Sequence, residues 1–368
     1  MNLRRLDGFF AAFSLSLVGA CAESSTAPRD RIVEGVDVTR LFAPPSQVEV
    51  TAMLDEWATR DVRAAGVQEV ESATVSLDTT PATLRIVSHD VGGVRHFGAI
   101  LAPSGAAPGS LPVLVITHGG DHGVDLSTDA LPFLDLAFGD LVADFVYVAP
   151  SFRSEPLSFS GRRYVSGGEP SPWDRDVDDA LALLNVALQT TPQADSGRIG
   201  VLGFSRGACV ALLMGIRDPR IDLVVEYFGP TDFFGPFVEG AVEQALRGSP
   251  PDLPGADYIN GKFIQPLKRG ELTIEDVRPE LLRRSPVYFA SRLPQVQVHH
   301  GTADPIVPVG EAERLIQVMQ ALGRTAPEFE SYIYPGGVHN PLTFPGAIER
   351  TRDFLRRLVT GPALAMVR

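Results

Sequence analysis

The sequence Ile-Gly-Val-Leu-Gly-Phe-Ser-Arg-Gly occupies residues 199–207. Its apolar first half is typical of a strand buried on both faces of a sheet, and Ala208–Gly215 beyond it has helical spacing. Two glycines flank Ser205 in a G-x-S-x-G pattern, whose chemistry requires a strand before it and a helix after it. The glycines permit a sharp turn that exposes the serine oxygen, and the N–H of Arg206 can then face a developing oxyanion. We predict that Ser205 is a nucleophile; the alternative is a glycine-rich turn with an idle serine.

A serine nucleophile needs a base, and the base needs a group that orients it. His339 follows a strand-like run at Phe329–Tyr334, and Asp304 follows another at Val296–Val298. Active sites of α/β proteins form at the carboxyl ends of strands, so these side chains are expected near Ser205. The chain order serine, aspartate, histidine fits this class of site. We therefore predict His339 as the base and Asp304 as its orienting acid, against the alternatives of a loop histidine and a turn-capping aspartate.

Continuous apolar runs alternate with helical patterns along most of the chain. Such runs indicate strands buried on both faces, and the alternation predicts an α/β fold with a mostly parallel central sheet and helices on both of its faces. The runs are Val113–Ile116, Phe145–Val148, Ile199–Leu202, Leu223–Val225 and Val296–Val298, and the helical patterns are Val48–Val62, Val177–Leu188, Ala208–Gly215, Glu311–Leu322 and Gly346–Leu358. Before these runs, Thr83–Val87 and His96–Leu101 predict an antiparallel pair.

The alternation breaks between Asp232 and Pro286. This stretch is rich in proline and holds two short helical patterns, Phe237–Leu246 and Ile274–Leu282. We interpret it as a helical lid inserted at about residues 232–286, over the carboxyl edge of the sheet, where such insertions shape substrate pockets.

From about Thr83 to Leu358 the chain resembles the catalytic domain of α/β-hydrolases, and more closely that of the prolyl oligopeptidase family and of dienelactone-hydrolase-like esterases. The matching pieces are residues 118–120 (His-Gly-Gly), 203–207 (Gly-Phe-Ser-Arg-Gly), 227–232 (Tyr-Phe-Gly-Pro-Thr-Asp), 285–286 (Ser-Pro) and the segments around His300 and His339. The resemblance implies an α/β-hydrolase fold, and it implies a catalytic triad of Ser205, His339 and Asp304.

The resemblance also implies an oxyanion hole beside the nucleophile. One donor would be the backbone N–H of Arg206. The second would come from His118-Gly119-Gly120, where some family members place a tyrosine hydroxyl and this chain has a histidine. A backbone N–H of Gly119 or Gly120 and the side chain of His118 are the candidates for that donor.

Peptidases of the prolyl oligopeptidase family carry a β-propeller before the catalytic domain. Only about sixty residues separate Cys21 from Ala82, which is fewer than four four-stranded blades need. The resemblance therefore predicts a serine hydrolase that acts on a small ester or a short peptide, with an esterase at least as well supported as a peptidase.

The first residues have the layout of a signal peptide, with two arginines, an apolar run and small residues before Cys21. The site resembles a bacterial lipobox, so we predict that residues 1–20 are removed and that Cys21 is lipidated. A plain secretory signal is the alternative. Residues 21–45 are then a lipidated N-terminus and tether, and residues 46–368 form the hydrolase domain. The protein is expected in the bacterial cell envelope, anchored to a membrane such as the outer membrane, or secreted.

The composition excludes several other classes of protein. The chain has 45 acidic and 32 basic side chains and a formal net charge of −13, whereas nucleic-acid binding needs clustered Lys and Arg. The acidic run at Trp173–Asp179 lacks the glycine and the glutamate of a calcium-binding loop and is interpreted as a helix start. The sequence has no zinc-binding spacing of histidines and cysteines and no nucleotide-binding glycine loop, so no metal or cofactor is predicted.

Other polar side chains receive structural interpretations. His89 and His96 flank the predicted hairpin and are expected at the surface. Arg153 is expected to pair with nearby acids such as Glu155, with a substrate carboxylate as the alternative partner. Cys209, on the helix after the serine, is expected in the core.

Two hypotheses for function follow from these observations. In the first, the protein is a serine hydrolase that forms an acyl-enzyme on Ser205. In the second, it is a non-catalytic envelope lipoprotein that binds a ligand in the cleft under the lid. Only the first hypothesis predicts covalent labelling of Ser205 by a serine-directed probe.

Overall fold

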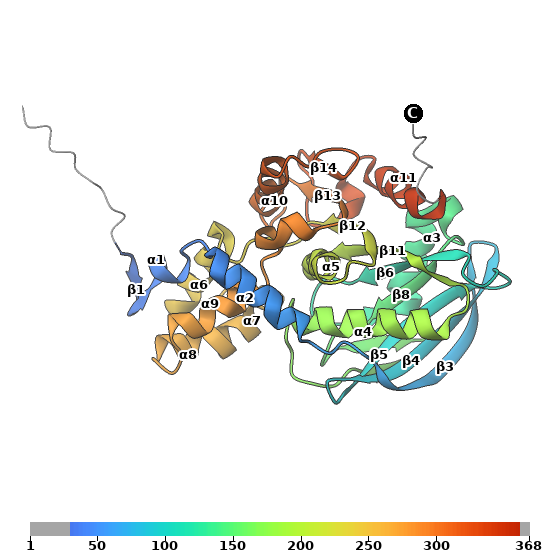
Figure 1. Ribbon diagram of the computed structural model, residues 1–368, viewed down its shortest axis with the longest axis horizontal. Helices are drawn as coiled ribbons and strands as arrows, with labels where there is room; N and C mark the ends of the chain where they lie inside the picture. The colour runs from blue at the N-terminus through green and yellow to red at the C-terminus, as the bar shows by residue number, and fades with distance from the viewer. Residues whose placement is uncertain (1–29, 361–368) are drawn as a thin grey trace, which may run out of the picture.

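The computed structural model describes residues 30–360 (Figure 1). The predicted signal peptide, residues 1–20, and the predicted lipidation site Cys21 lie outside the described residues. The strands are β1 (Ile32–Val33), β2 (Val36–Asp37), β3 (Ala65–Leu77), β4 (Thr80–Val91), β5 (Val94–Pro103), β6 (Leu111–Thr117), β7 (Val124–Asp125), β8 (Val146–Pro150), β9 (Pro156–Phe159), β10 (Arg162–Val165), β11 (Ala194–Phe204), β12 (Ile221–Tyr227), β13 (Gln295–Gly301) and β14 (Phe329–Tyr334).

The α-helices are α1 (Val38–Leu41), α2 (Gln47–Ala58), α3 (Leu131–Phe138), α4 (Arg175–Thr190), α5 (Arg206–Arg217), α6 (Pro236–Leu246), α7 (Ala256–Ile259), α8 (Gln265–Lys268), α9 (Ile274–Leu282), α10 (Gly310–Ala321) and α11 (Ala347–Thr360). Short turns of other helix types are η1 (Leu126–Ala130), η2 (Gly139–Leu141), η3 (Asn260–Ile264), η4 (Pro286–Arg292) and η5 (Pro341–Thr343). Within residues 30–360, no helix has both the length and the apolar character that a membrane span requires.

One large sheet forms the centre of the described chain, with strand order β14-β13-β12-β11-β6-β8-β5-β4-β3. The strands from β14 to β8 pair in parallel, and β5, β4 and β3 continue the sheet in antiparallel pairing. The predicted mostly parallel sheet is confirmed. Because the parallel strands end at a common edge, the residues that follow β11, β12, β13 and β14 can meet there.

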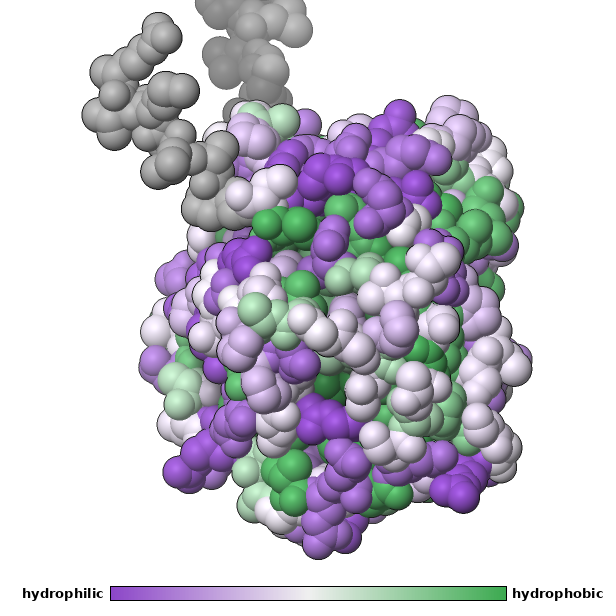
Figure 2. Space-filling model, turned by 90° about the vertical axis from the view of Figure 1, so that its right-hand side faces the viewer, coloured by the Kyte–Doolittle hydropathy of each residue, from purple (hydrophilic) through white to green (hydrophobic). Residues whose placement is uncertain are grey.

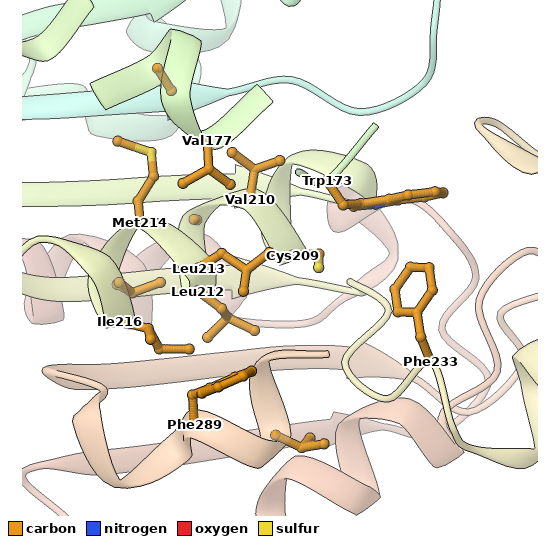
Figure 3. Close-up of a cluster of buried hydrophobic side chains, with 14 of the residues drawn as sticks. Trp173, Val177, Cys209, Val210, Leu212, Leu213, Met214, Ile216, Phe233 and Phe289 are labelled. Atoms are coloured by element: carbon orange, nitrogen blue, oxygen red, sulfur yellow. The ribbon is translucent and has the colours of Figure 1, made fainter. Parts of the chain in front are cut away.

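Helices cover both faces of the sheet (Figure 1). On β6, Val113 and Val115 join one buried cluster, whereas Leu114 between them joins another, as the two-residue period of a strand requires. The first cluster packs under α4, α5 and α10, and the second packs under α3 and α11. Figure 3 shows part of the first cluster, with Val177 of α4 beside Val210 of α5. Both faces of the central strands are therefore buried, which explains their continuous apolar sequence.

Strand β3 is the longest of the elements that the sequence interpretation missed. It pairs with β4 at the outer edge of the sheet, and of its thirteen residues only Leu77 is buried. Figure 2 shows this side of the molecule, where hydrophilic and intermediate residues predominate and hydrophobic residues form small groups. An exposed edge strand needs no apolar run, so the pattern that revealed the central strands is absent from it.

The segment between β12 and β13 consists of α6, α7, η3, α8 and α9, which we call the lid. The lid helices gather at one end of the molecule together with α1 and α2 (Figure 1). Arg278 of α9 donates from Nη1 to three backbone carbonyl oxygens between Arg40 and Ala43, and so holds the end of α1 on the lid. The segment predicted as a tether up to residue 45 is therefore folded from residue 32 onward.

His89 and His96 are buried, contrary to the predicted surface positions. They face each other across the β4–β5 pair, and α4 covers them, so that His96 Nε2 lies 3.5 Å from Asp179 Oδ1. Burial lowers the pKa of His89 to about 4 and that of His96 to about 3. Arg153 pairs with Asp179 and not with Glu155, because α4 brings the aspartate to it.

Candidate active site

Ser205 lies on a strained turn between β11 and α5. Its φ is +53°, a conformation that side-chain-bearing residues rarely adopt, and its N–H donates to the Tyr227 carbonyl oxygen at 2.9 Å. A Cβ atom at Gly203 would lie 2.2 Å from the Gly207 carbonyl oxygen, and a Cβ at Gly207 would lie 2.1 Å from that of Thr117. Only glycine fits at these two positions, so the G-x-S-x-G pattern is explained by close backbone packing.

The structure brings His339 and Asp304 together from the loops after β14 and β13. His339 Nδ1 lies 2.7 Å from Asp304 Oδ2, while Asp304 Oδ1 accepts hydrogen bonds from the N–H groups of Ile306 and Val307 at 2.8 and 3.0 Å. Asp304 therefore caps its own turn with one oxygen and orients the histidine with the other. A carboxylate acceptor at Nδ1 requires the proton there, so the Nε2 atom of His339 is left free to accept a proton.

The surroundings of Asp304 favour its ionised form. Burial acts to raise the pKa of its carboxyl group, but the hydrogen bonds from His339, Ile306 and Val307 outweigh burial and hold the pKa below its ordinary value. His300 Nε2 also lies 3.6 Å from Asp304 Oδ2 and bonds to the Val307 carbonyl oxygen at 2.9 Å. Burial lowers the pKa of His300, so it supports the turn as a neutral ring.

Phe228 links the predicted nucleophile, Ser205, to the predicted base, His339. It follows Tyr227, whose carbonyl oxygen accepts the Ser205 N–H, and its ring packs on the His339 ring with centroids 4.3 Å apart. In the described part of the chain, the Ser205 hydroxyl and His339 form no direct hydrogen bond. In sites without substrate this contact is often long, and it tightens when the reacting group binds.

The predicted oxyanion loop, residues 118–120, lies directly against Ser205. A Cβ atom at Gly119 would lie 3.1 Å from the Ser205 Cβ, so the glycine allows the loop to approach. Among residues 30–360, the N–H groups of Gly119, Gly120 and Arg206 donate to no protein acceptor. They are therefore available to an oxyanion formed on a carbonyl bound at the serine.

The side chain of His118 faces other groups. Its Nδ1 atom lies 3.0 Å from the Gly119 carbonyl oxygen, its ring packs on Phe152, and its Nε2 atom lies 3.7 Å from Glu155 Oε2. Burial lowers the pKa of His118 to about 4, so the ring is neutral. These contacts favour a backbone N–H over the His118 ring as the second oxyanion donor.

The side chain of Arg206 was overlooked in the sequence, where only its backbone N–H was considered. The guanidinium is 3% exposed and binds Asp176 with two hydrogen bonds of 2.8 and 3.0 Å. Its Nη1 atom bonds to Glu155 and also donates to the Gly120 carbonyl oxygen at 3.1 Å. Arg206 therefore ties the oxyanion loop to two buried carboxylates. Asp176 belongs to the acidic run at Trp173–Asp179, which the sequence predicts to be a helix start. Its pairing with Arg206 depends on the burial of both side chains, which the sequence of the run does not reveal.

A cavity of about 90 Å³ lies between the lid and Ser205. Its wall combines α6, the proline-rich loop at 250–254, α7 and η3 with Ile306 and Val307, which follow the predicted catalytic aspartate. No carboxylate lines the cavity in the described residues, and the Arg206 guanidinium beside it is occupied by its own acidic partners. Apart from Ser205, Arg206 and the lid amide Asn260, the lining residues are apolar or aromatic.

Two buried glutamates support the loop that follows β12. Glu226 Oε2 accepts from the Gly229 N–H at 3.0 Å, and Glu311 Oε2 accepts from the N–H groups of Thr231 and Asp232. Burial raises the pKa of Glu226 to about 8 and that of Glu311 to about 7. Within residues 30–360, no group of three or more His, Cys, Asp or Glu side chains is placed to hold a metal ion.

A Glu226→Gln variant should lose less stability at alkaline pH than the original protein. The folded-state pKa of Glu226 lies above its ordinary value of 4.5, so its stabilising contribution is complete below about pH 4.5 and is lost as the pH rises through about 8. We expect the two unfolding free energies to diverge by about 4 kcal/mol between pH 5 and 9, since the folded-state pKa lies about three units above pH 5 and one unit corresponds to about 1.4 kcal/mol. Chemical denaturation across this range measures the difference, and parallel curves would contradict the expectation.

Comparison with known proteins identifies the fold. No protein-family model and no curated protein matches the chain. Among solved structures, acetyl xylan esterase 1 from a Thermoanaerobacterium species is 18% identical, with a TM-score of 0.56 over 89% of this chain and 95% of that one. An acetyl xylan esterase from a Paenibacillus species is 17% identical, with a TM-score of 0.57 over 86% and 98%. An α/β hydrolase from a Penicillium species is 16% identical, with a TM-score of 0.50 over 76% and 100%.

These likenesses and the strand order show that the chain has the α/β-hydrolase fold, as the sequence predicted. At sequence identities of 16–18%, these solved structures establish the fold alone. The activity depends on the residues of the site.

Proposed function

We propose that the protein is a serine hydrolase that cleaves a carboxylic ester with Ser205 as nucleophile, His339 as base and Asp304 as orienting acid. The observation that carries the proposal is the 2.7 Å contact between His339 Nδ1 and Asp304 Oδ2, formed beside a serine on a strained strand–helix turn. Strain at such a turn costs free energy, and it is expected where a functional side chain must be presented.

In the proposed reaction, His339 Nε2 takes the proton from Ser205 while the serine oxygen attacks the ester carbonyl carbon. The carbonyl oxygen becomes an oxyanion, which the N–H group of Arg206 and that of Gly119 or Gly120 would stabilise. The carbon–oxygen bond to the alcohol then breaks, and the alcohol leaves with the proton held by His339. Water, deprotonated by the same histidine, attacks the acyl-enzyme, releases the acid and restores the serine. Asp304 stabilises the imidazolium formed in both steps.

An ester is favoured over a peptide because of the cavity beside the nucleophile. A peptide that placed its charged amino terminus in the cavity would need an acidic partner there, and no carboxylate lines the cavity among the described residues. An apolar wall instead suits an uncharged acyl group.

A fluorophosphonate probe tests the nucleophile directly. The purified protein should be labelled on one residue, and the Ser205→Ala variant should show no labelling and no hydrolysis of p-nitrophenyl esters. Ser104→Ala is a suitable control, because Ser104 is exposed and lies at the end of β5, and it should behave as the original protein does. A folded protein without labelling would refute the hydrolase and favour the ligand-binding lipoprotein.

We also propose that Cys21 carries a lipid that anchors the protein in the bacterial cell envelope. The proposal is supported by the apolar run and small residues before the cysteine. In a bacterial host, the original protein should sediment with membranes, and Cys21→Ser should release it to the soluble fraction. An unchanged distribution would contradict the anchor.

A further inference from the structure

The cavity under the lid has a defined relation to the reacting groups. Ser205 and Arg206 line it, together with Ile306 and Val307, whereas His339 and the oxyanion-loop glycines lie outside its lining. The base must lie on the side of the leaving alcohol, because it delivers a proton to that oxygen. A cavity that reaches the serine without including the base is therefore placed to hold the other part of an ester, the acyl group.

The extent of the cavity wall indicates the size of the acyl group. The wall runs from Ser205 across α6, the loop at 250–254, α7 and η3, and the cavity has a volume of about 90 Å³. It has room for more than one water-sized group, because about 10–15 Å³ is enough for one water molecule. An acetyl group, with three non-hydrogen atoms, would leave most of this apolar wall without contacts.

The wall also selects against charge. Its lid part is made of alanine, valine, phenylalanine, proline, leucine and isoleucine side chains with one amide, Asn260. The Asn260 Oδ1 atom already accepts from Gln265 Nε2 at 2.9 Å. The Arg206 guanidinium also lines the cavity but is already paired with Glu155 and Asp176, so a charged acyl group would lose its hydration without gaining a free partner of opposite charge.

We propose that this cavity is the acyl-binding site, and that the substrate is an ester of an uncharged apolar acid whose acyl group is longer than acetyl. The proposal rests on the proposed esterase function and specifies its substrate class. Each methylene that enters the cavity should raise kcat/KM about threefold to fourfold, because burying one methylene is worth about that factor in binding.

The first test is a series of p-nitrophenyl esters from acetate to dodecanoate. The proposal predicts that kcat/KM rises from acetate to an optimum at a longer acyl chain. Succinate monoester, which is similar in length but charged, should react at least tenfold more slowly than hexanoate. A protein that prefers acetate, or accepts succinate as readily as hexanoate, would overturn the acyl-site proposal while leaving the hydrolase intact.

The second test fills the cavity from α6. Ala241 lies on the cavity wall, so Ala241→Leu should lower kcat/KM for octanoate at least tenfold and change acetate less than threefold. Gln244→Leu introduces the same side chain on an exposed position of the same helix and should change neither value. Phe237→Ala enlarges the cavity and should move the optimum to a longer chain.

The outcomes separate the two proposals. Equal effects of Ala241→Leu on acetate and octanoate, with normal fluorophosphonate labelling, would place the acyl group elsewhere. If the original protein shows neither labelling nor ester hydrolysis, the proposed esterase function is refuted, and the proposed acyl-binding site is refuted with it.

Discussion

An Asp304→Asn variant is expected to fold as the original protein does and to lose about 10³- to 10⁴-fold in kcat. The asparagine oxygen can still accept hydrogen bonds from the N–H groups of Ile306 and Val307, so the turn should persist. The amide NH₂ would then face His339 Nδ1, which would become a hydrogen-bond acceptor. The ring proton would move to Nε2, and the histidine could no longer take a proton from Ser205.

Steady-state hydrolysis and the rate of fluorophosphonate labelling measure this loss, and the thermal midpoint reports on folding. Asp232→Asn is a matched control. Asp232 also caps its own turn through the Phe234 N–H and is buried, but it pairs with Arg314 instead of His339. Its variant should retain kcat within a few fold. If Asp304→Asn kept more than a tenth of the original kcat, the orienting role of Asp304 would be wrong.

Replacing Arg206 with lysine should lower kcat about 10- to 100-fold with little change in KM. The guanidinium fork binds Asp176 through two atoms and reaches the Gly120 carbonyl oxygen with a third, and a single ammonium cannot reproduce this geometry. The oxyanion loop would lose its fixed position, which matters chiefly in the transition state. Arg206→Met should in addition cost about 3–5 kcal/mol of stability, because two carboxylates would remain buried without a cation.

The control for this effect is Arg217→Lys, on the same helix. Arg217 is equally buried and pairs with Asp178 of α4, but it makes no contact with the oxyanion loop. It should lower the unfolding free energy without a comparable change in kcat. If the two lysine variants lose stability and kcat to the same extent, Arg206 is a structural residue and does not position the loop.

The central part of the site could be predicted from the sequence because its constraints are local. Gly203 and Gly207 are required by backbone packing at the turn, and Ser205 is defined by its place between them. Asp304 and His339 were found because parallel strands end at one edge of the sheet, so each residue that follows a strand lies near the others. The alternating apolar runs were sufficient for the sheet and its covering helices, since central strands are apolar on both faces.

Other features depended on tertiary structure. β3 lacks the continuous apolar run of the central strands, and only Ala73, Val75 and Leu77 near its end alternate with polar residues. His89 and His96 look like surface residues until α4 is placed over them. The polarity of a residue shows how it behaves in water, whereas its burial depends on which element packs against it.

The sequence by itself therefore determined the α/β architecture, the strained serine turn and the order of the three proposed catalytic residues, because short-range geometry and strand order require them. The tertiary structure alone decided that Arg206, Asp176 and Glu155 form a buried network behind the oxyanion loop. It also decided that the lid closes an apolar cavity of about 90 Å³ over Ser205. Both features join side chains far apart in the chain, and their chemistry depends on the exclusion of water that packing produces.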